Sequence, residues 1–273
     1  MQGFRWVSKT IRVTGLALAT VAALALAAAP ASAQTVTDIV KRGRVRIGVL
    51  IGAPPYGSID AQGKPVGYDA DVANLIGKYM GVPVEMVPLT PPSRIPALES
   101  GKADFLVATL APTAERAKVV MFTIPYSVFQ VGIYAKRGDA IKAWADLRGK
   151  RIGVNRGSSV EGELTKREKE LNLTISRFED DSTTMQALFS GQVDAIAGPD
   201  AQAYAAMKAR GDGVDCEQKF IFARQPNSMT VKKDAFELHQ YLNNVIYIMK
   251  LNGELSEISE RWVGVPLPDL PTF

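Results

Sequence analysis

Few residues in this sequence could perform bond-making chemistry. His239 is the only histidine and Cys216 the only cysteine among 273 residues. A Ser-His-Asp triad, a multi-histidine zinc site or a haem site would depend on that single imidazole, and a disulfide framework or a cysteine zinc cluster needs more than one thiol. We therefore expect no Ser-His-Asp triad, no metal site and no cofactor.

One loop has the pattern of an anion-binding element. Gly157-Ser158-Ser159 follows the apolar strand pattern of residues 151–154 and precedes a helical pattern. Main-chain N–H groups at a helix start attract anions, and serine is also a favoured ordinary helix cap. Ser158 and Ser159 are therefore candidates for holding a negatively charged group, with plain helix capping as the alternative.

The first 33 residues have the three-part pattern of a secretory signal peptide. The basic residues Arg5, Lys9 and Arg12 precede an apolar stretch over residues 13–29, which ends shortly before Ala31-Ser32-Ala33. We expect cleavage after Ala33 and prefer this to a membrane anchor, because about 17 apolar residues are short for a span. Without these residues the chain has 29 basic and 28 acidic side chains, which does not support a basic face for nucleic acid.

Two segments of the chain recur in the same order. Residues 46–49 return at 151–154, and residues 97–104 return at 187–194 with five of eight positions identical. Each copy reads as a short strand, an amphipathic helix, a second strand, a helix ending in Ser-Gly, and a buried strand. The pattern predicts a duplicated α/β unit.

Strands that alternate with helices predict an α/β fold with two lobes, each a mostly parallel sheet flanked by helices. The strand Phe129 to Lys136 and the strand near Met229 to Lys233 are the candidates for crossing between the lobes. We assign residues 34–134 plus 227–273 to lobe 1 and residues 135–226 to lobe 2. Because ligands of open α/β sheets bind beyond the carboxyl ends of the strands, we expect a small molecule between the lobes.

Caps and stops predict the helices in these lobes. Asp69 is the expected cap of a helix through Tyr79, and Thr183 or Thr184 is the expected cap of a helix in the second lobe. A long helix is expected from about Asp234, broken by Gly253 and followed by a shorter helix.

Several further segments carry a recognisable combined pattern. They are Arg44–Val49 with Pro54-Pro55-Tyr56, and residues 63–73, 95–98, 113–118, 122–126 and 146–154. Together they make the chain resemble the periplasmic solute-binding proteins of polar amino-acid ABC transporters, family 3. The resemblance covers nearly all of the chain after residue 33. It implies the two-lobed periplasmic-binding-protein fold, which closes on an amino acid and presents it to a membrane permease.

The resemblance also implies roles for single residues in lobe 1. Arg116 matches the arginine that grips the ligand α-carboxylate, a task that suits the guanidinium fork; a surface salt bridge is the alternative. Thr109 and Ala111 match the loop that donates to the same carboxylate, where Ala111 departs from the usual Ser or Thr and has only its N–H to offer. Tyr56 matches the aromatic wall of the pocket, with core packing as the alternative.

Further matches concern the rest of the ligand. Ser158 and Ser159 match the loop that completes the carboxylate site. Pro199 stands where the family commonly has an aspartate for the ligand ammonium, and Asp200, the next residue, is the candidate replacement. Arg94 lies in a stretch similar to the Asn-Arg-Ile-Pro of binding proteins for acidic amino acids, where the arginine meets a side-chain carboxylate; a solvent-facing arginine is equally compatible with the sequence.

The resemblance implies a periplasmic solute-binding component of an ABC importer. We also expect a monomer and, from the balanced charge, no nucleic-acid partner. Its ligand would be an amino acid, with aspartate or glutamate as candidates, or a related small carboxylate. An enzyme on the same scaffold, a periplasmic cyclohexadienyl or arogenate dehydratase, is the alternative, with Glu161 and Glu163 as candidate general acids. A third class is a sensory ligand-binding module that acts through a separate receptor.

Overall fold

The computed structural model describes residues 35–211 and 213–270. The predicted signal peptide, residues 1–33, lies outside this range. Within the described residues, no helix is both long enough and apolar enough to cross a membrane.

Lobe 1 is organised on three parallel strands. They are β1 (Val45–Leu50), β4 (Val84–Leu89) and β5 (Phe105–Leu110), with β1 in the middle. All six residues of β5 are buried, as expected for a parallel strand covered on both faces. The other elements of this lobe are α2 (Val36–Arg42), β2 (Ser58–Ile59), β3 (Pro65–Val66), α3 (Tyr68–Met80), the 3₁₀ helix η1 (Pro91–Ser93), α4 (Arg94–Glu99), the 3₁₀ helix η2 (Arg116–Lys118), α8 (Phe236–Leu251) and α9 (Glu254–Val263).

Lobe 2 repeats the same plan with fewer helices. Its parallel strands are β7 (Arg151–Asn155), β8 (Thr174–Phe178) and β9 (Ala195–Pro199), with β7 in the middle. The other elements are the 3₁₀ helix η3 (Trp144–Leu147), α5 (Ser159–Arg167), α6 (Asp181–Phe189) and α7 (Asp200–Arg210).

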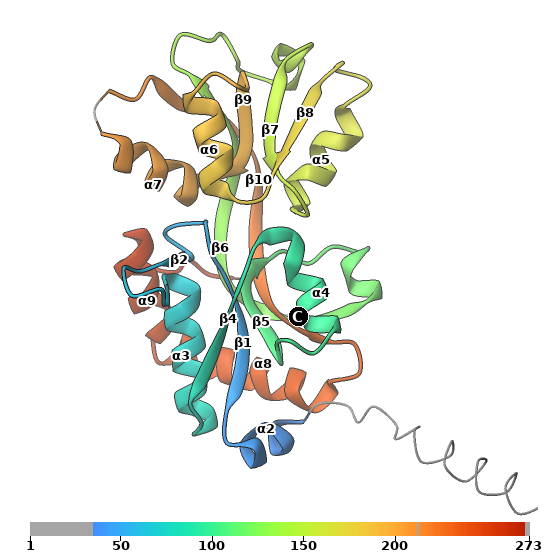
Figure 1. Cartoon of the computed structure of the whole chain (residues 1–273), viewed down its shortest axis with the longest axis vertical. Coiled ribbons are helices and arrows are strands. Elements are labelled where there is room, and N and C mark those ends of the chain that lie inside the picture. The colour runs from blue at the N-terminus through green and yellow to red at the C-terminus, as the bar shows by residue number, and fades with distance from the viewer. Residues whose placement is uncertain (1–34, 212, 271–273) are drawn as a thin grey trace, which may run out of the picture. The chain divides into compact units, whose positions relative to one another are not determined.

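Two long antiparallel strands join the lobes. β6 (Val120–Lys136) and β10 (Cys216–Lys232) each have 17 residues and pair with each other along their length. β10 also pairs with β5 of lobe 1, and β6 with β9 of lobe 2, so the strand order is β4-β1-β5-β10-β6-β9-β7-β8 (Figure 1). The two-lobed α/β fold with two crossing strands is therefore confirmed, while the lobe limits at 134/135 and 226/227 stay a prediction.

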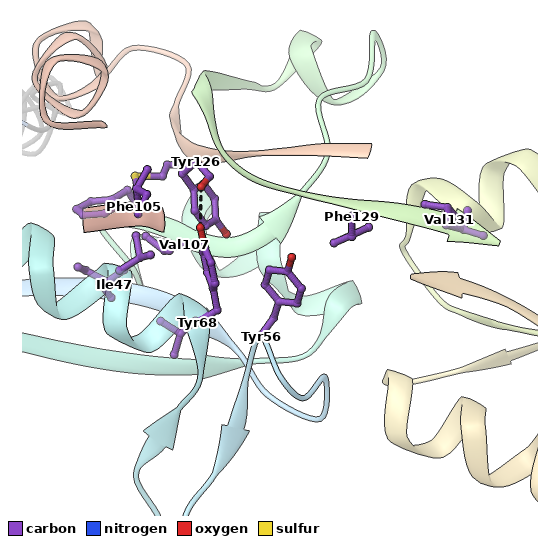
Figure 2. Close-up of a cluster of buried hydrophobic side chains, with 14 of the residues drawn as sticks. Ile47, Tyr56, Tyr68, Phe105, Val107, Tyr126, Phe129 and Val131 are labelled. Atoms are coloured by element: carbon purple, nitrogen blue, oxygen red, sulfur yellow. Dashed lines mark hydrogen bonds between the residues drawn. The ribbon is translucent and has the colours of Figure 1, made fainter. Parts of the chain in front are cut away.

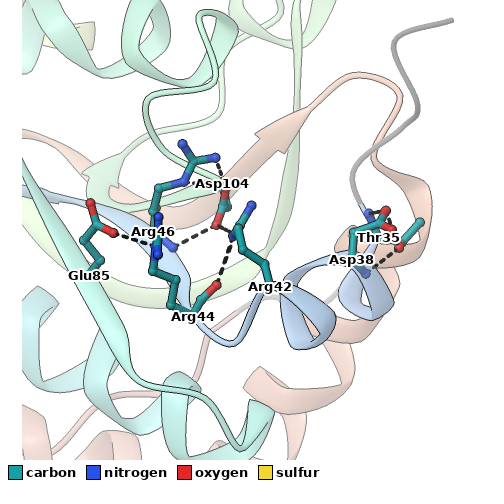
Figure 3. Close-up of polar contacts among 7 residues, drawn as sticks. All are labelled: Thr35, Asp38, Arg42, Arg44, Arg46, Glu85 and Asp104. Atoms are coloured by element: carbon teal, nitrogen blue, oxygen red, sulfur yellow. Dashed lines mark hydrogen bonds and ion pairs between the residues drawn. The ribbon is translucent and has the colours of Figure 1, made fainter. Parts of the chain in front are cut away.

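The repeated sequence segments form the same local structure twice. Asp104 accepts hydrogen bonds from the main-chain N–H of Arg46 at 2.8 Å and from its guanidinium at 2.7 Å (Figure 3). Asp194 accepts the equivalent bonds from Arg151 at 2.8 Å and 2.6 Å. In each lobe this Arg–Asp contact links the start of the central strand to the turn that precedes the neighbouring strand.

Buried aromatic side chains fill lobe 1 close to β6. Figure 2 shows Tyr56, Tyr68 and Tyr126 together with Phe129, and Tyr68 Oη donates to the Tyr126 carbonyl at 2.9 Å. Such a tyrosine cluster packs large apolar rings while each buried hydroxyl needs a polar partner. Tyr126 Oη accepts a hydrogen bond from the N–H of Thr109 in β5 at 2.9 Å.

Two predicted helix caps are wrong. α3 begins after Gly67, and Asp69 is instead a fully buried side chain that accepts a hydrogen bond from Tyr126 Oη at 2.8 Å. α6 is capped by Asp180, whose carboxylate accepts from the Thr183 N–H at 2.8 Å. Asp180 precedes the two threonines and takes the cap because a carboxylate is at least as good a cap acceptor as a hydroxyl.

Candidate functional site

A pocket lies where the carboxyl ends of the strands of both lobes meet. Leu50 ends β1, Asn155 ends β7 and Pro199 ends β9, and all three line it. Six of the eight ligand-binding residues expected from the sequence line the same pocket: Arg94, Thr109, Ala111, Arg116, Ser158 and Ser159. The first four come from lobe 1 and the two serines from lobe 2, so the pocket draws on both.

Arg116 presents a partly buried guanidinium to this pocket. Its Nη1 donates to the Ala111 carbonyl at 2.8 Å and its Nη2 to the Gly157 carbonyl at 2.8 Å. An arginine has five N–H donors, so three are left after these two bonds. Burial lowers the pKa of Arg116, because a charged group loses hydration there. A carboxylate in the pocket would restore the lost stabilisation.

Arg94 is more deeply buried and more fully bonded than Arg116. It is 4% exposed and donates to the carbonyls of Pro91, Ala108 and Thr109 at 2.9–3.2 Å, and to that of Gly157 at 3.3 Å. These four bonds leave one N–H. Burial, followed by the positive charge of Arg116, lowers the pKa of Arg94 to about 9, so the side chain is still a cation at neutral pH. The solvent-facing alternative for this residue is excluded.

The helix start in lobe 2 lies opposite the two arginines. Ser158 caps α5, and its hydroxyl accepts from the Glu161 N–H at 3.0 Å. The N–H groups of Ser159 and Val160 belong to the first turn of α5 and have no acceptor within the helix. Ser158 is therefore a helix cap, and the N–H groups of Ser159 and Val160 are left to bind an anion.

Buried hydrogen bonds support the main chain at Thr109, near the carboxyl end of β5. Thr109 has a positive φ of 43°, which is uncommon for a residue with a side chain. Its N–H donates to Tyr126 Oη at 2.9 Å, and that hydroxyl in turn donates to Asp69 at 2.8 Å. Burial raises the pKa of Asp69 well above its usual range, more than its bond to Tyr126 lowers it. This series of hydrogen bonds holds the main chain at Thr109 in one conformation.

Tyr56 and Asp200 do not line the pocket. Tyr56 is buried, with its ring 5.1 Å from that of Tyr68 and 5.7 Å from that of Phe129, which does line the pocket (Figure 2). Asp200 accepts main-chain N–H bonds from Ala201 at 2.8 Å and Gln130 at 3.2 Å. Tyr56 therefore supports the pocket from behind, and Asp200 bonds the start of its own helix to β6.

Sequence reasoning missed four polar residues of the pocket: Asn155, Asp181, Gln202 and Gln225. Gln225 lies in β10, where its Oε1 accepts from the Ser159 hydroxyl. Asn155 directly ends β7 and Asp181 opens the helix after β8, so the rule that ligands lie beyond strand ends could have found both. Gln202 lies in the first turn of α7 and carries no such signal, because which helix face is turned inward depends on how the helix packs.

Asp181 is a buried acidic group at the start of α6. It is 8% exposed, and burial raises its pKa to about 7, although hydrogen bonding from Asn155 and the charge of Arg94 oppose the rise. The neighbouring carboxylate of Asp180 adds to the rise. Asp180 rather than Asp181 caps the helix, so capping does not explain this buried acid.

The raised pKa predicts how stability depends on pH. Between the ordinary aspartate pKa of about 3.9 and about 7, the folded protein holds a proton that the unfolded chain has lost, so stability from Asp181 is full below this range and falls as pH rises through it. Asp181→Asn removes this dependence. We expect the ligand-free variant to be more stable than wild type at pH 8, by roughly 3–5 kcal/mol from the pKa difference. Urea unfolding at pH 4 and pH 8 measures it, and an unchanged or lower stability at pH 8 would contradict the assignment.

Direct contacts hold the two lobes together around the pocket. Besides the arginine bonds to Gly157, the N–H of Ser182 in lobe 2 donates to the Gly52 carbonyl of lobe 1 at 3.0 Å. A Cβ added to Gly52 would lie 2.6 Å from the Asp180 side chain, so the glycine permits this approach.

The two glutamates considered as general acids are both held in ion pairs. Glu161 contacts Arg177 at 2.5 Å and accepts the Gly157 N–H at 2.7 Å. Glu163 pairs with Lys166 and Arg167, and these hydrogen bonds lower its pKa. A general acid at neutral pH needs the opposite shift.

Comparison with known proteins identifies relatives over most of the chain. The model of the bacterial extracellular solute-binding proteins, family 3, matches residues 45–265. The glutamate/aspartate import solute-binding protein of Escherichia coli (strain K12) is 29% identical over 269 residues, which cover 93% of this chain and 88% of the relative. Among solved structures, an ancestral arginine-binding protein bound to arginine is similar with a TM-score of 0.77 and 37% identity, covering 81% of this chain and 98% of that one.

A further solved structure bears on the enzyme alternative. The ancestral amino acid-binding protein AncCDT-1, a precursor of cyclohexadienyl dehydratase, is similar with a TM-score of 0.76 and 30% identity, covering 84% of this chain and all of that one. The relatives thus share a fold and amino-acid binding but differ in the solute that they are named for.

Proposed function

Because the chain belongs to the bacterial extracellular solute-binding proteins of family 3, we propose that it captures an amino acid between its lobes in the periplasm and delivers it to the permease of an ABC importer. The ligand would bind as the lobes close, by bending of β6 and β10, and the closed form would be the one that the permease receives. We propose that the protein acts as a monomer.

The observation that carries the proposal is the position of Arg116. Its guanidinium lies in a pocket built from both lobes, with three N–H donors left over and the start of α5 opposite it. A guanidinium fork facing helix N–H groups suits a carboxylate, because both sides donate to the same anion. A ligand bound this way holds the lobes together.

The charges of the pocket support an acidic amino acid. Arg94 and Arg116 are cations, and among the described lining residues Asp181 is the one carboxylate, so the site has a net charge of about +1 when Asp181 is ionised. A ligand with a net charge of −1 would neutralise it, and buried charge is costly when it is not neutralised. We therefore propose aspartate or glutamate, with Arg94 contributing mainly its charge, since four of its N–H groups are already bonded to the main chain.

A thermal-shift screen of the twenty amino acids tests this function. Binding to the folded state alone stabilises a protein by mass action, so a ligand at about 100 times its dissociation constant should add about 2.7 kcal/mol. We expect L-aspartate and L-glutamate to raise the melting temperature more than L-asparagine and L-glutamine. If no amino acid raised it at millimolar concentration, the proposal would be wrong; a larger shift with a neutral or basic amino acid would keep the function and reject the acidic ligand.

The similarity to AncCDT-1 keeps the dehydratase as the second candidate. Since Glu161 and Glu163 are ion-paired, the one pocket carboxyl group with a raised pKa is Asp181 among the described residues. Incubation of the purified protein with prephenate or arogenate, followed by assay for phenylpyruvate or phenylalanine, separates the two functions. We expect no turnover above the uncatalysed rate, and product formation would favour the enzyme.

A further inference from the structure

The pocket contains a buried carboxylate, Asp181, whose pKa stays raised although the charge of Arg94 acts against the rise. Among the described residues, no basic side chain forms an ion pair with Asp181, which is 8% exposed. Its position as the first residue of α6 gives it some support from the helix dipole. That support is smaller than the cost of burying an unpaired charge, so the fold alone does not account for the residue.

A second acceptor in the same pocket also has no partner. Gln202 is 3% exposed, and its Oε1 is buried without a hydrogen-bond donor among the described residues. It lies in the first turn of α7, next to α6 in lobe 2, and it lines two adjoining cavities together with Asp181. A buried amide oxygen left unbonded is destabilising, so two costly acceptors converge on one place.

The nearby polar groups satisfy Asp181 only in part, through Asn155, and leave Gln202 Oε1 without a donor. Asn155 Oδ1 already accepts from Thr184 Oγ1 at 2.6 Å, and only the amide side of Asn155 is turned to Asp181. Arg94 and Arg116 direct their bonds at main-chain carbonyls. What the acceptors lack is a compact group with several N–H donors and a positive charge, and a primary ammonium has three donors and that charge.

We propose that Asp181 and Gln202 form the binding site for the ammonium group of the ligand, so that the pocket selects amino acids over carboxylic acids that lack an amino group. The inference rests on the proposed function and adds the part of the ligand that Arg116 does not bind. The ligand carboxylate then lies against Arg116 and the start of α5, and its ammonium lies against the starts of α6 and α7.

This assignment differs from the one that the sequence favours. Asp200 was the expected ammonium acceptor, but its carboxylate bonds to the N–H groups of Ala201 and Gln130 and lies outside the pocket lining. Asp180 is the matched neighbour on the other side: it caps α6 and also lies outside that lining. Asparagine is also a good helix cap, so Asp180→Asn and Asp200→Asn change the charge with little effect on their helices.

The experiment compares four variants by titration calorimetry at pH 8, where Asp181 is ionised in the free protein. The probes are L-glutamate, L-aspartate, L-glutamine and L-arginine, with 2-oxoglutarate, glutarate and succinate as partners that lack the ammonium. We expect Asp181→Asn to reduce the affinity for the amino acid that binds wild type by about 30-fold or more. Gln202→Met should reduce the same affinity by about 5-fold. Asp180→Asn and Asp200→Asn should bind as wild type does. Thermal unfolding at the same pH shows that each variant is folded.

The carboxylic acids give the decisive contrast. They should bind wild type more weakly than their amino-acid counterparts do. Asp181→Asn should leave the affinity for these acids unchanged or increase it, because the substitution removes a negative charge. Equal amino-acid affinity in wild type and Asp181→Asn, or loss in Asp200→Asn instead, would overturn the inference and leave the proposed function standing. Preference of wild type for the carboxylic acids would also overturn it. If wild type bound none of these probes and no amino acid in the thermal-shift screen, the inference and the proposed function would both fail.

Discussion

Replacement of Arg116 by alanine will weaken amino-acid binding by about 100-fold or more, which is about 2.7 kcal/mol. The variant leaves the ligand carboxylate in a pocket between the lobes without its main charged partner. It also removes the bonds from Arg116 to the Ala111 and Gly157 carbonyls, and the second of these joins the lobes. Both losses act on the closed, ligand-bound form.

Two further variants make this test specific. Arg116→Lys keeps the charge but loses the fork, so its affinity should fall between those of wild type and Arg116→Ala. Arg44→Ala removes an exposed arginine that pairs with Glu85 at the amino end of the sheet, away from the pocket, and its affinity should match wild type. Titration calorimetry with the ligand from the thermal-shift screen measures all three. Undiminished affinity in Arg116→Ala would show that this guanidinium does not hold the ligand.

Replacement of Asp104 by alanine will destabilise the protein by about 3 kcal/mol. Its side chain is fully buried and joins Arg42 and Arg46 to the main chain of β1, as Figure 3 shows. Removing it leaves two arginines without their shared anion and the N–H of Arg46 without an acceptor. The expected loss is at the low end for a buried pair, because both arginine side chains remain about 30% exposed and can be hydrated.

The duplication supplies the control for this prediction. Asp194 makes the equivalent contacts with Arg151 in lobe 2, but its side chain is 34% exposed. Water can replace part of what it provides, so Asp194→Ala should lose less than half as much stability as Asp104→Ala. Urea unfolding measures both. Equal losses would mean that burial does not set the strength of this contact.

Much of the fold could be predicted from local sequence patterns. The two copies of Ala-Leu-x-Ser-Gly-x-x-Asp do form a helix, a left-handed glycine at Gly101 or Gly191, and a strand beside the central one. Such elements can be predicted because helix ends and buried strands depend on residues that are close in the sequence. The caps of α3 and α6 were predicted wrongly because several suitable residues lie close together at each helix start. At α3, the hydrogen bond between Tyr126 and Asp69 buries the carboxylate, so Asp69 does not cap the helix.

Much of the candidate site could be predicted before the structure. The family resemblance implied Arg94, Thr109, Ala111 and Arg116, and the loop before a helix start also indicated Ser158 and Ser159; all six line one pocket. Tyr56 and Asp200 also lie close to loops at strand ends, yet Tyr56 is enclosed by Tyr68 and Phe129, and Asp200 is bonded to β6. Proximity to a strand end therefore locates a site without saying which side chains point into it.

The sequence alone indicated that this chain is duplicated and built of two mostly parallel sheets joined by crossing strands, because short-range patterns predict these features. Only the tertiary structure decided that Arg94 is buried and bonded to main-chain carbonyls, and that Asp181 and Gln202 face the pocket in place of Asp200. The reason is geometric. The direction of a side chain at a helix start depends on the rotation of that helix against its sheet and on the approach of the other lobe, and neither is encoded in residues adjacent to it.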